Sequence, residues 1–151
     1  MISAAILFID SSTDSMNEAM PEINDGIVTG DSEYNEAVDL VNNKNFYEGM
    51  AKAESAGNNY NNSLNKLLEI QGNFSSDING VQQEYITVLI KELEYKLKAV
   101  DLLKNAIECF EVYENYTGSN YGFEANDAMD QAVEFQNQRD SIVKENPKLF
   151  K

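Results

Sequence analysis

The spacing of the apolar residues constrains this chain most. Between the turn-like stretches SSDING and NYTGSNYG they recur every three or four positions, at Val81, Tyr85, Leu89, Leu93, Leu97, Val100, Leu103, Ile107, Phe110 and Tyr113. This spacing follows the roughly 3.6 residues of an α-helical turn, and strand-like alternation does not occur in the sequence. We predict a helix over about 77–116, roughly 60 Å long, which needs neighbouring helices to cover its apolar stripe.

Helical spacing extends through most of the remaining sequence. A seam with alternating steps of four and three predicts a helix over 46–74. A shorter helix is expected over 31–43, and a C-terminal helix over about 121–146, while Pro21 predicts a kink or a restart upstream. The predicted fold is all-α, an up-and-down bundle of three long antiparallel helices plus one or two N-terminal helices.

Charged pairs mark the expected solvent side of the longest helix. Glu92 with Lys96, and Glu94 with Lys98, are spaced i,i+4 in the order that stabilises an isolated helix. We therefore place both pairs in water, opposite the apolar stripe.

The overall charge is strongly negative. The chain has 26 acidic and 11 basic residues, a formal charge of −15, and its first basic residue is Lys44. Such a surface repels the phosphates of nucleic acid and anionic lipid headgroups. We expect no nucleic-acid binding, and a protein or cationic ligand as the partner.

The opening stretch MISAAILFID bears on where the protein resides. Residues 1–9 are apolar but supply less than half of the roughly 20 residues that span a bilayer. The acidic flank, with no Lys or Arg before Lys44, is typical of the outer side of a membrane anchor. We divide the chain into an apolar segment, 1–12, as a candidate membrane-anchor stub, and an acidic bundle domain, 13–151. The alternative is that residues 1–9 pack on the bundle or on a second subunit.

Three Asn residues begin glycosylation acceptor motifs. Asn61, Asn73 and Asn115 each fit N-x-[ST], but 19 Asn and 15 Ser plus Thr among 151 residues give roughly two matches by chance. They are candidate glycosylation sites that add little to the argument for an outer location.

The residue inventory excludes several kinds of site. The chain has no His and one Cys, Cys109, so neither an intrachain disulfide nor a zinc site of Cys and His can form. A calcium-loop match from Asp25 through Gly30 to Glu36 lacks oxygen ligands at two positions. No nucleophile elbow or phosphate-binding loop occurs. We expect no metal, no cofactor and no enzymatic activity.

The connection YENYTGSNYGFE is the most suggestive surface feature. It places Tyr113, Tyr116, Tyr121 and Phe123 among Asn, Gly and Ser residues. Tyrosine beside small polar residues is typical of adaptable recognition surfaces. We take these four residues as a candidate recognition loop; the alternative is that their rings cap the end of the bundle.

Together these features predict a non-enzymatic helical-bundle interaction or sensing domain, extracytoplasmic and N-terminally anchored. The alternative is a cytoplasmic adaptor or a self-associating, coiled-coil-like structural protein, because an unbroken apolar seam also favours a homodimer.

Overall fold

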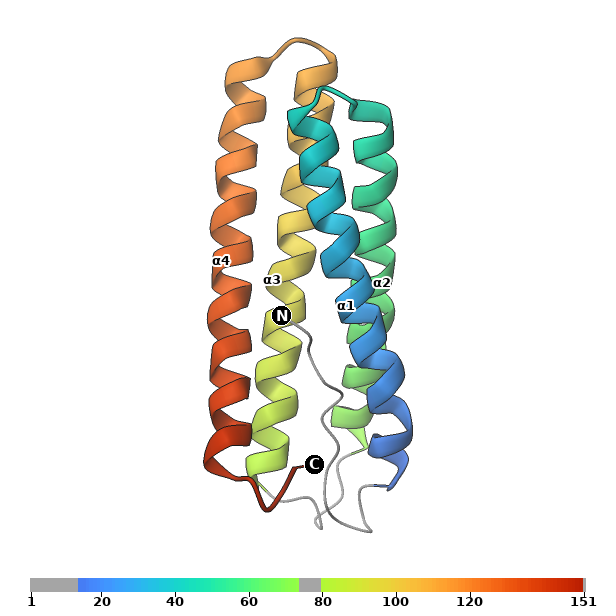
Figure 1. Ribbon diagram of the computed structural model, residues 1–151, viewed down its shortest axis with the longest axis vertical. Coiled ribbons are helices and arrows are strands. Elements are labelled where there is room, and N and C mark those ends of the chain that lie inside the picture. The colour runs from blue at the N-terminus through green and yellow to red at the C-terminus, as the bar shows by residue number, and fades with distance from the viewer. Residues whose placement is uncertain (1–13, 74–79, 151) are drawn as a thin grey trace.

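The computed structural model describes residues 14–73 and 80–150, and these form four long helices. In chain order they are α1 (Asp14–Asn42), α2 (Phe46–Gly72), α3 (Gly80–Glu111) and α4 (Asn115–Glu145). They run alternately up and down along the long axis of the molecule (Figure 1). The predicted all-α class is confirmed for the described residues, which contain no extended strand.

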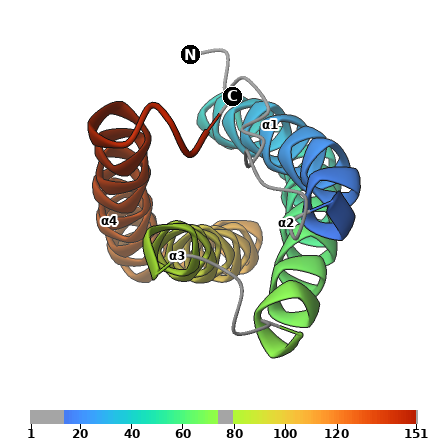
Figure 2. The ribbon, with the colours of Figure 1, turned by 90° about the horizontal axis from the view of Figure 1, so that it is seen from below.

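The four helices are arranged in chain order around the core. α1 packs on α2, α2 on α3 and α3 on α4, whereas no Cα atom of α1 lies within 8 Å of a Cα atom of α4 in the described part of the chain. Seen from below, the helices follow an open curve with α1 and α4 at its two ends (Figure 2). Three of the four neighbouring helix pairs around the bundle are therefore packed on each other, and the fourth pair, α1 and α4, is not.

α1 is one helix of 29 residues, longer than the predicted 31–43 segment. Pro21 lies inside it and does not end it. The buried side chains on either side of Pro21, Met20 and Ile23, keep one helical phase and belong to the same core cluster. Tertiary packing of this apolar face outweighs the local preference for a break.

The packing of α1 on α2 depends on small residues. A Cβ atom added at Gly30 would lie 2.6 Å from the ring of Tyr60, so the bare backbone of α1 accommodates that ring. Ala37 on α1 and Ala53 and Ala56 on α2 are fully buried and belong to the same core cluster as Tyr60. Small side chains let two helices approach closely and leave space for one large ring.

α4 begins six residues earlier than predicted, at Asn115. Gly118, which suggested a turn in the sequence, is buried in its first turns, where an added Cβ would lie 2.7 Å from the ring of Phe110. Further along, α4 buries Ala125, Ala128 and Ala132. α4 thus packs mainly with small side chains on α3, its principal helical neighbour.

The chain after α4 crosses the lower end of the bundle. Residues 146–150 turn from the end of α4 toward α1 (Figure 2). Phe150 is buried, and its ring centroid lies 5.3 Å from that of Tyr85 on α3. Residues 1–12, the candidate anchor stub, lie outside the described residues, and none of the described helices is both long and apolar enough to cross a membrane.

Candidate functional site

Two tight turns stand at the same end of the bundle and share one geometry. The α1–α2 turn is closed by the N–H of Asn45, which donates to the Leu40 carbonyl at 2.8 Å, and the α3–α4 turn by the N–H of Glu114, which donates to the Cys109 carbonyl at 2.8 Å. Such six-to-one bonds define a Schellman motif, whose next-to-last residue is left-handed and usually Gly. Here that position is Lys44 in one turn, with φ of 61°, and a tyrosine in the other.

Tyr113 is the residue with φ of 64° in the α3–α4 turn. A bulky L-residue in the left-handed region costs of order 1–2 kcal/mol relative to a right-handed one. Its ring gains no burial in return, because Tyr113 is 88% exposed. Backbone strain of this kind is found preferentially at binding and catalytic sites.

The four aromatic residues of the predicted recognition loop do not lie on one loop. Tyr113 is in the turn, while Tyr116, Tyr121 and Phe123 lie on α4, so the prediction of a loop was wrong. Tyr116 and Phe123 are 82% and 67% exposed, and Tyr121 is half-buried. Except for Tyr121, the rings do not cap the core but project into solvent.

Sequence reasoning missed two further exposed apolar residues near these turns. Tyr47, in the first turn of α2, is 84% exposed, and Val112, in the α3–α4 turn, is 63% exposed. We call Tyr47, Val112, Tyr113, Tyr116 and Phe123 the aromatic end. The signal was available in the sequence, because Tyr47 follows the turn-like VNNKN, but only the fold brings the two turns to the same end.

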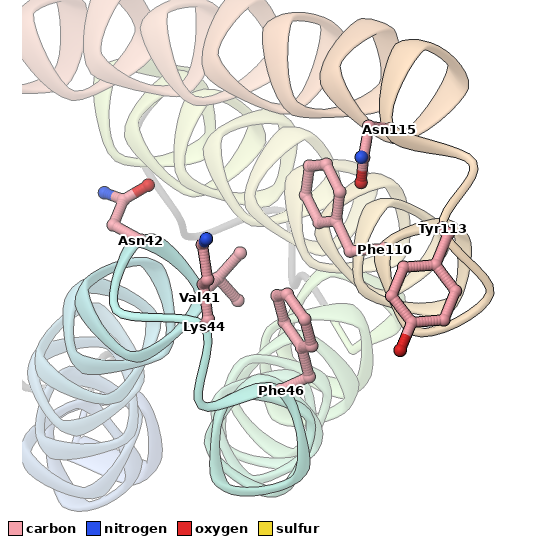
Figure 3. A pocket seen from close by; sticks show the side chains of 7 residues that line it. All are labelled: Val41, Asn42, Lys44, Phe46, Phe110, Tyr113 and Asn115. Atoms are coloured by element: carbon pink, nitrogen blue, oxygen red, sulfur yellow. The ribbon is translucent and has the colours of Figure 1, made fainter.

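A pocket of about 400 Å³ opens between the two turns (Figure 3). Val41, Asn42, Lys44, Phe46, Phe110, Tyr113 and Asn115 line it. The rings of Phe46 and Phe110 are stacked, with centroids 5.8 Å apart. The pocket therefore has an apolar floor of two phenyl rings and a rim of turn residues that includes Tyr113.

The charge around the pocket differs from the charge within it. No carboxylate is among the described residues that line it, and Lys44 is its one charged lining residue. Outside it, Glu111, Glu114 and Glu124 are exposed on the neighbouring turn and helices. An apolar centre with an acidic surround favours an occupant with an apolar anchor and basic flanking groups.

The three glycosylation motifs have different surroundings. Asn61 is exposed on α2, but Ser63, the third residue of its motif, is buried and donates its hydroxyl to the Ile23 carbonyl at 2.8 Å. Asn73 is the C-cap residue of α2, and the rest of its motif lies outside the described residues. Asn115 is exposed and lines the pocket at the aromatic end. Glycosylation of these three residues stays a prediction.

The middle of the bundle contains a layer of buried charged side chains. Glu92 and Lys96 on α3 and Arg139 on α4 are 0%, 2% and 3% exposed. The predicted solvent position of the Glu92–Lys96 pair was therefore wrong. Together with Asp31 on α1 and Tyr60 on α2, these side chains form what we call the charged layer, to which all four helices contribute.

Each charge of this layer has a partner of opposite sign. The Lys96 Nζ lies 2.7 Å and 2.9 Å from the two carboxylate oxygens of Asp31 and 3.1 Å from Glu92 Oε1. Arg139 Nε donates to Glu92 Oε2 at 2.5 Å, and the Tyr60 hydroxyl donates to Asp31 Oδ1 at 2.7 Å. Two cations thus balance two anions, as buried charges require.

The pKa shifts follow from burial and from these partners. Burial raises the pKa of Tyr60 strongly, and the negative charge of Asp31 adds to the effect. Burial alone would lower the pKa of Arg139, but its hydrogen bond to Glu92 and the charge of that carboxylate raise it above the ordinary value. Tyr60 therefore stays neutral and Arg139 stays positively charged at physiological pH.

The metal interpretations find no support in the described residues. Asp25, Gly30 and Glu36, the proposed calcium loop, lie inside α1 and form no loop. No group of three potential ligands comes together anywhere in residues 14–73 and 80–150.

Comparison with known proteins does not assign the chain to a family. No family model matches the chain, and neither the curated proteins nor the solved structures give a match.

Proposed function

We propose that this protein is a non-enzymatic binding domain that recognises a protein partner through the aromatic end. One observation carries the proposal: five large apolar side chains at this end are 63–88% exposed, and one of them, Tyr113, lines a pocket with a floor of stacked phenyl rings. Exposed apolar clusters of this kind mark interaction sites in soluble domains. Tyrosine is also among the residues that contribute most to binding energy at interfaces.

The chemistry of the site suggests the chemistry of the partner. The pocket above the stacked rings of Phe46 and Phe110 has room for an apolar side chain, and the exposed acids Glu111, Glu114 and Glu124 favour basic residues beside it. The net charge of −15 extends this preference over longer distances. We expect a segment with an aromatic or branched aliphatic anchor flanked by Lys or Arg.

Selection from a random peptide library displayed on phage, with the purified full chain as bait, tests this proposal. A double variant, Tyr113→Ser with Tyr116→Ser, serves as the counter-selection bait. We expect peptides with an apolar anchor and basic flanks to be enriched on the wild type and not on the variant. Failure to enrich any peptide, or equal enrichment on both baits, would contradict it.

A matched control uses exposed apolar residues outside the aromatic end. Val133 on α4 and Leu68 on α2 are 42% and 43% exposed. Val133→Ser and Leu68→Ser should leave peptide binding unchanged. If they weaken it as much as the double variant does, general hydrophobicity and not the aromatic end explains the binding.

We also propose that the domain acts outside the cytoplasm on an N-terminal anchor. Two sequence features support this: residues 1–9 are apolar, and no Lys or Arg precedes Lys44. Membrane fractionation with an alkaline wash, followed by protease treatment of intact cells, tests it. Pelleted and protease-sensitive protein would support an outer anchored location, and soluble, protected protein would instead favour the cytoplasmic adaptor.

A further inference from the structure

A second pocket, of about 250 Å³, lies between α1, α3 and α4, on the side of the bundle where α1 and α4 are not packed on each other. Its apolar wall includes Tyr34 and Val38 from α1, Leu103 and Ala106 from α3, and Phe123 and Ala125 from α4. Val41, Asn42 and Phe110 line both this pocket and the one at the aromatic end. An occupant would contact both α1 and α4, whose Cα atoms nowhere come within 8 Å of each other in the described residues.

The lining selects against charge. Its polar members among the described residues are Tyr34, Asn42, Ser119 and Asn126, with no carboxylate and no cation. A charged ligand would lose its hydration in this pocket without an opposite charge to pair with, so the lining favours an uncharged molecule. Mostly apolar walls with a few polar groups are typical of small-molecule sites between the helices of a bundle.

Tyr34 supplies a hydrogen-bond donor that the protein itself does not use. Its side chain is 4% exposed, and its hydroxyl is buried without a hydrogen-bond partner. Burial raises the pKa of Tyr34 to about 12, so the hydroxyl keeps its proton at physiological pH. The hydroxyl is shielded from solvent, and an occupant would reach it by displacing the side chains beside it.

We propose that this pocket binds a small uncharged molecule with an aromatic or aliphatic body and one hydrogen-bond acceptor, and that the bound molecule links α1 to α4. The acceptor would pair with the Tyr34 hydroxyl, and the apolar body would fill the space between Leu103, Ala106 and Phe123. This proposal does not depend on the protein-binding role of the aromatic end, although Phe123 belongs to the aromatic end and also lines this pocket. Through the shared Phe110, a bound molecule would contact the floor of the outer pocket.

Fluorine NMR with two probes of similar shape tests this proposal on the full chain. The probe para-fluoroacetophenone has a carbonyl acceptor, and para-fluoroethylbenzene has none. We expect saturable binding of the first probe in about the millimolar range, as for a ligand of roughly ten heavy atoms. Tyr34→Phe should weaken the ketone about 3–10-fold, the effect of one lost hydrogen bond, and leave the hydrocarbon unchanged.

Blocking variants show whether binding occurs in this pocket. Gly122 lines it, and a Cβ atom added there meets nothing within 4 Å, so Gly122→Leu would extend a side chain into free space. We expect both probes to bind this variant at least about tenfold more weakly, since the added side chain occupies their volume. Ser119→Leu, at an exposed position of the same wall, serves if the first variant does not fold.

The matched control is Gly80→Leu at the opposite end of the bundle, where an added Cβ also meets nothing. It makes the same chemical change and should leave both affinities as in the wild type. Three results would each overturn the proposal: no saturable shift with the wild type, wild-type affinity in the folded blocking variants, or equal weakening of both probes by Tyr34→Phe.

Discussion

The charged layer and the aromatic end reverse the usual relation between residue type and burial. In the layer, Glu92, Lys96 and Arg139 are at most 3% exposed, whereas Tyr113 and Tyr116 at the aromatic end are more than 80% exposed. Lys, Arg and Glu are almost never fully buried unless paired, and large aromatic residues are usually well covered. Both regions therefore conflict with side-chain preference, but for different reasons.

Helix phase explains the charged layer. Tyr85, Leu89, Glu92 and Lys96 step by four, three and four, so the charges follow the same inward face as their apolar neighbours. Helix phase does not explain the aromatic end, where the exposed rings come from one turn and two helices. Local choices that conflict with the fold and have no internal compensation are expected at functional sites. The charged layer is compensated by its ion pairs, and the aromatic end has no such compensation.

The largest expected effect is in the charged layer. Glu92→Ala would leave Lys96 and Arg139 buried with one carboxylate fewer, and removing one partner of a buried ion pair typically costs about 3–5 kcal/mol. We expect a loss of this size in the free energy of unfolding, measured by urea denaturation. Glu94→Ala, two residues away at an exposed position, should change it by no more than about 0.5 kcal/mol.

Replacement of the whole buried triad sharpens this test. Glu92→Leu, Lys96→Leu and Arg139→Met together remove the charges and keep apolar volume, and such replacements are often neutral or stabilising. We therefore expect the triple variant to recover most of the stability that Glu92→Ala loses. If the triple variant is as unstable as Glu92→Ala, the paired charges stabilise the bundle more than apolar side chains of similar volume do at the same positions.

The next effect appears at alkaline pH. Tyr34 ionises with a pKa of about 12 in the folded protein, against 10.0 for the ordinary side chain. Because the folded pKa is raised, the stability that Tyr34 contributes is complete below pH 10 and is lost as the pH rises toward 12. This rise in the pKa of Tyr34 corresponds to roughly 2–3 kcal/mol of stability.

Comparison with Tyr34→Phe isolates this contribution from the other buried tyrosines. Denaturation of both proteins at several pH values from 8 to 12 gives the difference directly. We expect the wild type to lose stability relative to the variant only above about pH 10. A pH-independent difference would show that Tyr34 ionises as freely in the folded state as in the unfolded chain.

A comparable effect on binding, and almost none on stability, is expected at the aromatic end. Tyr116→Ser removes an 82% exposed ring, so the free energy of unfolding should change by no more than about 0.5 kcal/mol. Affinity for a selected peptide should fall by roughly 2 kcal/mol, or about 30-fold, as for an interface hot spot. Isothermal titration calorimetry measures the loss, and a large drop in stability with intact binding would reverse our assignment of this region.

The sequence predicted the positions of the helices better than it predicted which side chains are buried, which are exposed and which come together. Apolar spacing identified α2 and α3 closely, because their stripes face two neighbours. It began the α1 helix at residue 31, with a kink or restart at Pro21 upstream, and it began α4 too late. The structure packs Gly30 against Tyr60 and Gly118 against Phe110 within continuous helices. The aromatic residues were identified, but their gathering with Tyr47 depends on two turns far apart in sequence meeting at one end.

The smallest expected effect concerns the strained backbone of Tyr113, and it tests whether this residue has a role in binding. Tyr113→Gly would relieve the left-handed strain at φ of 64° and should stabilise the fold by about 1 kcal/mol, although the greater freedom of Gly in the unfolded chain reduces the gain. Lys44→Gly, at the matching position with φ of 61°, should give a similar gain in thermal and urea unfolding. Only Tyr113→Gly should also weaken peptide binding, because it alone removes a ring from the rim of the pocket. If both variants gain stability and neither loses affinity, Tyr113 is a strained turn residue without a role in recognition, and the contrast with the charged layer would rest on Tyr116 and its neighbours.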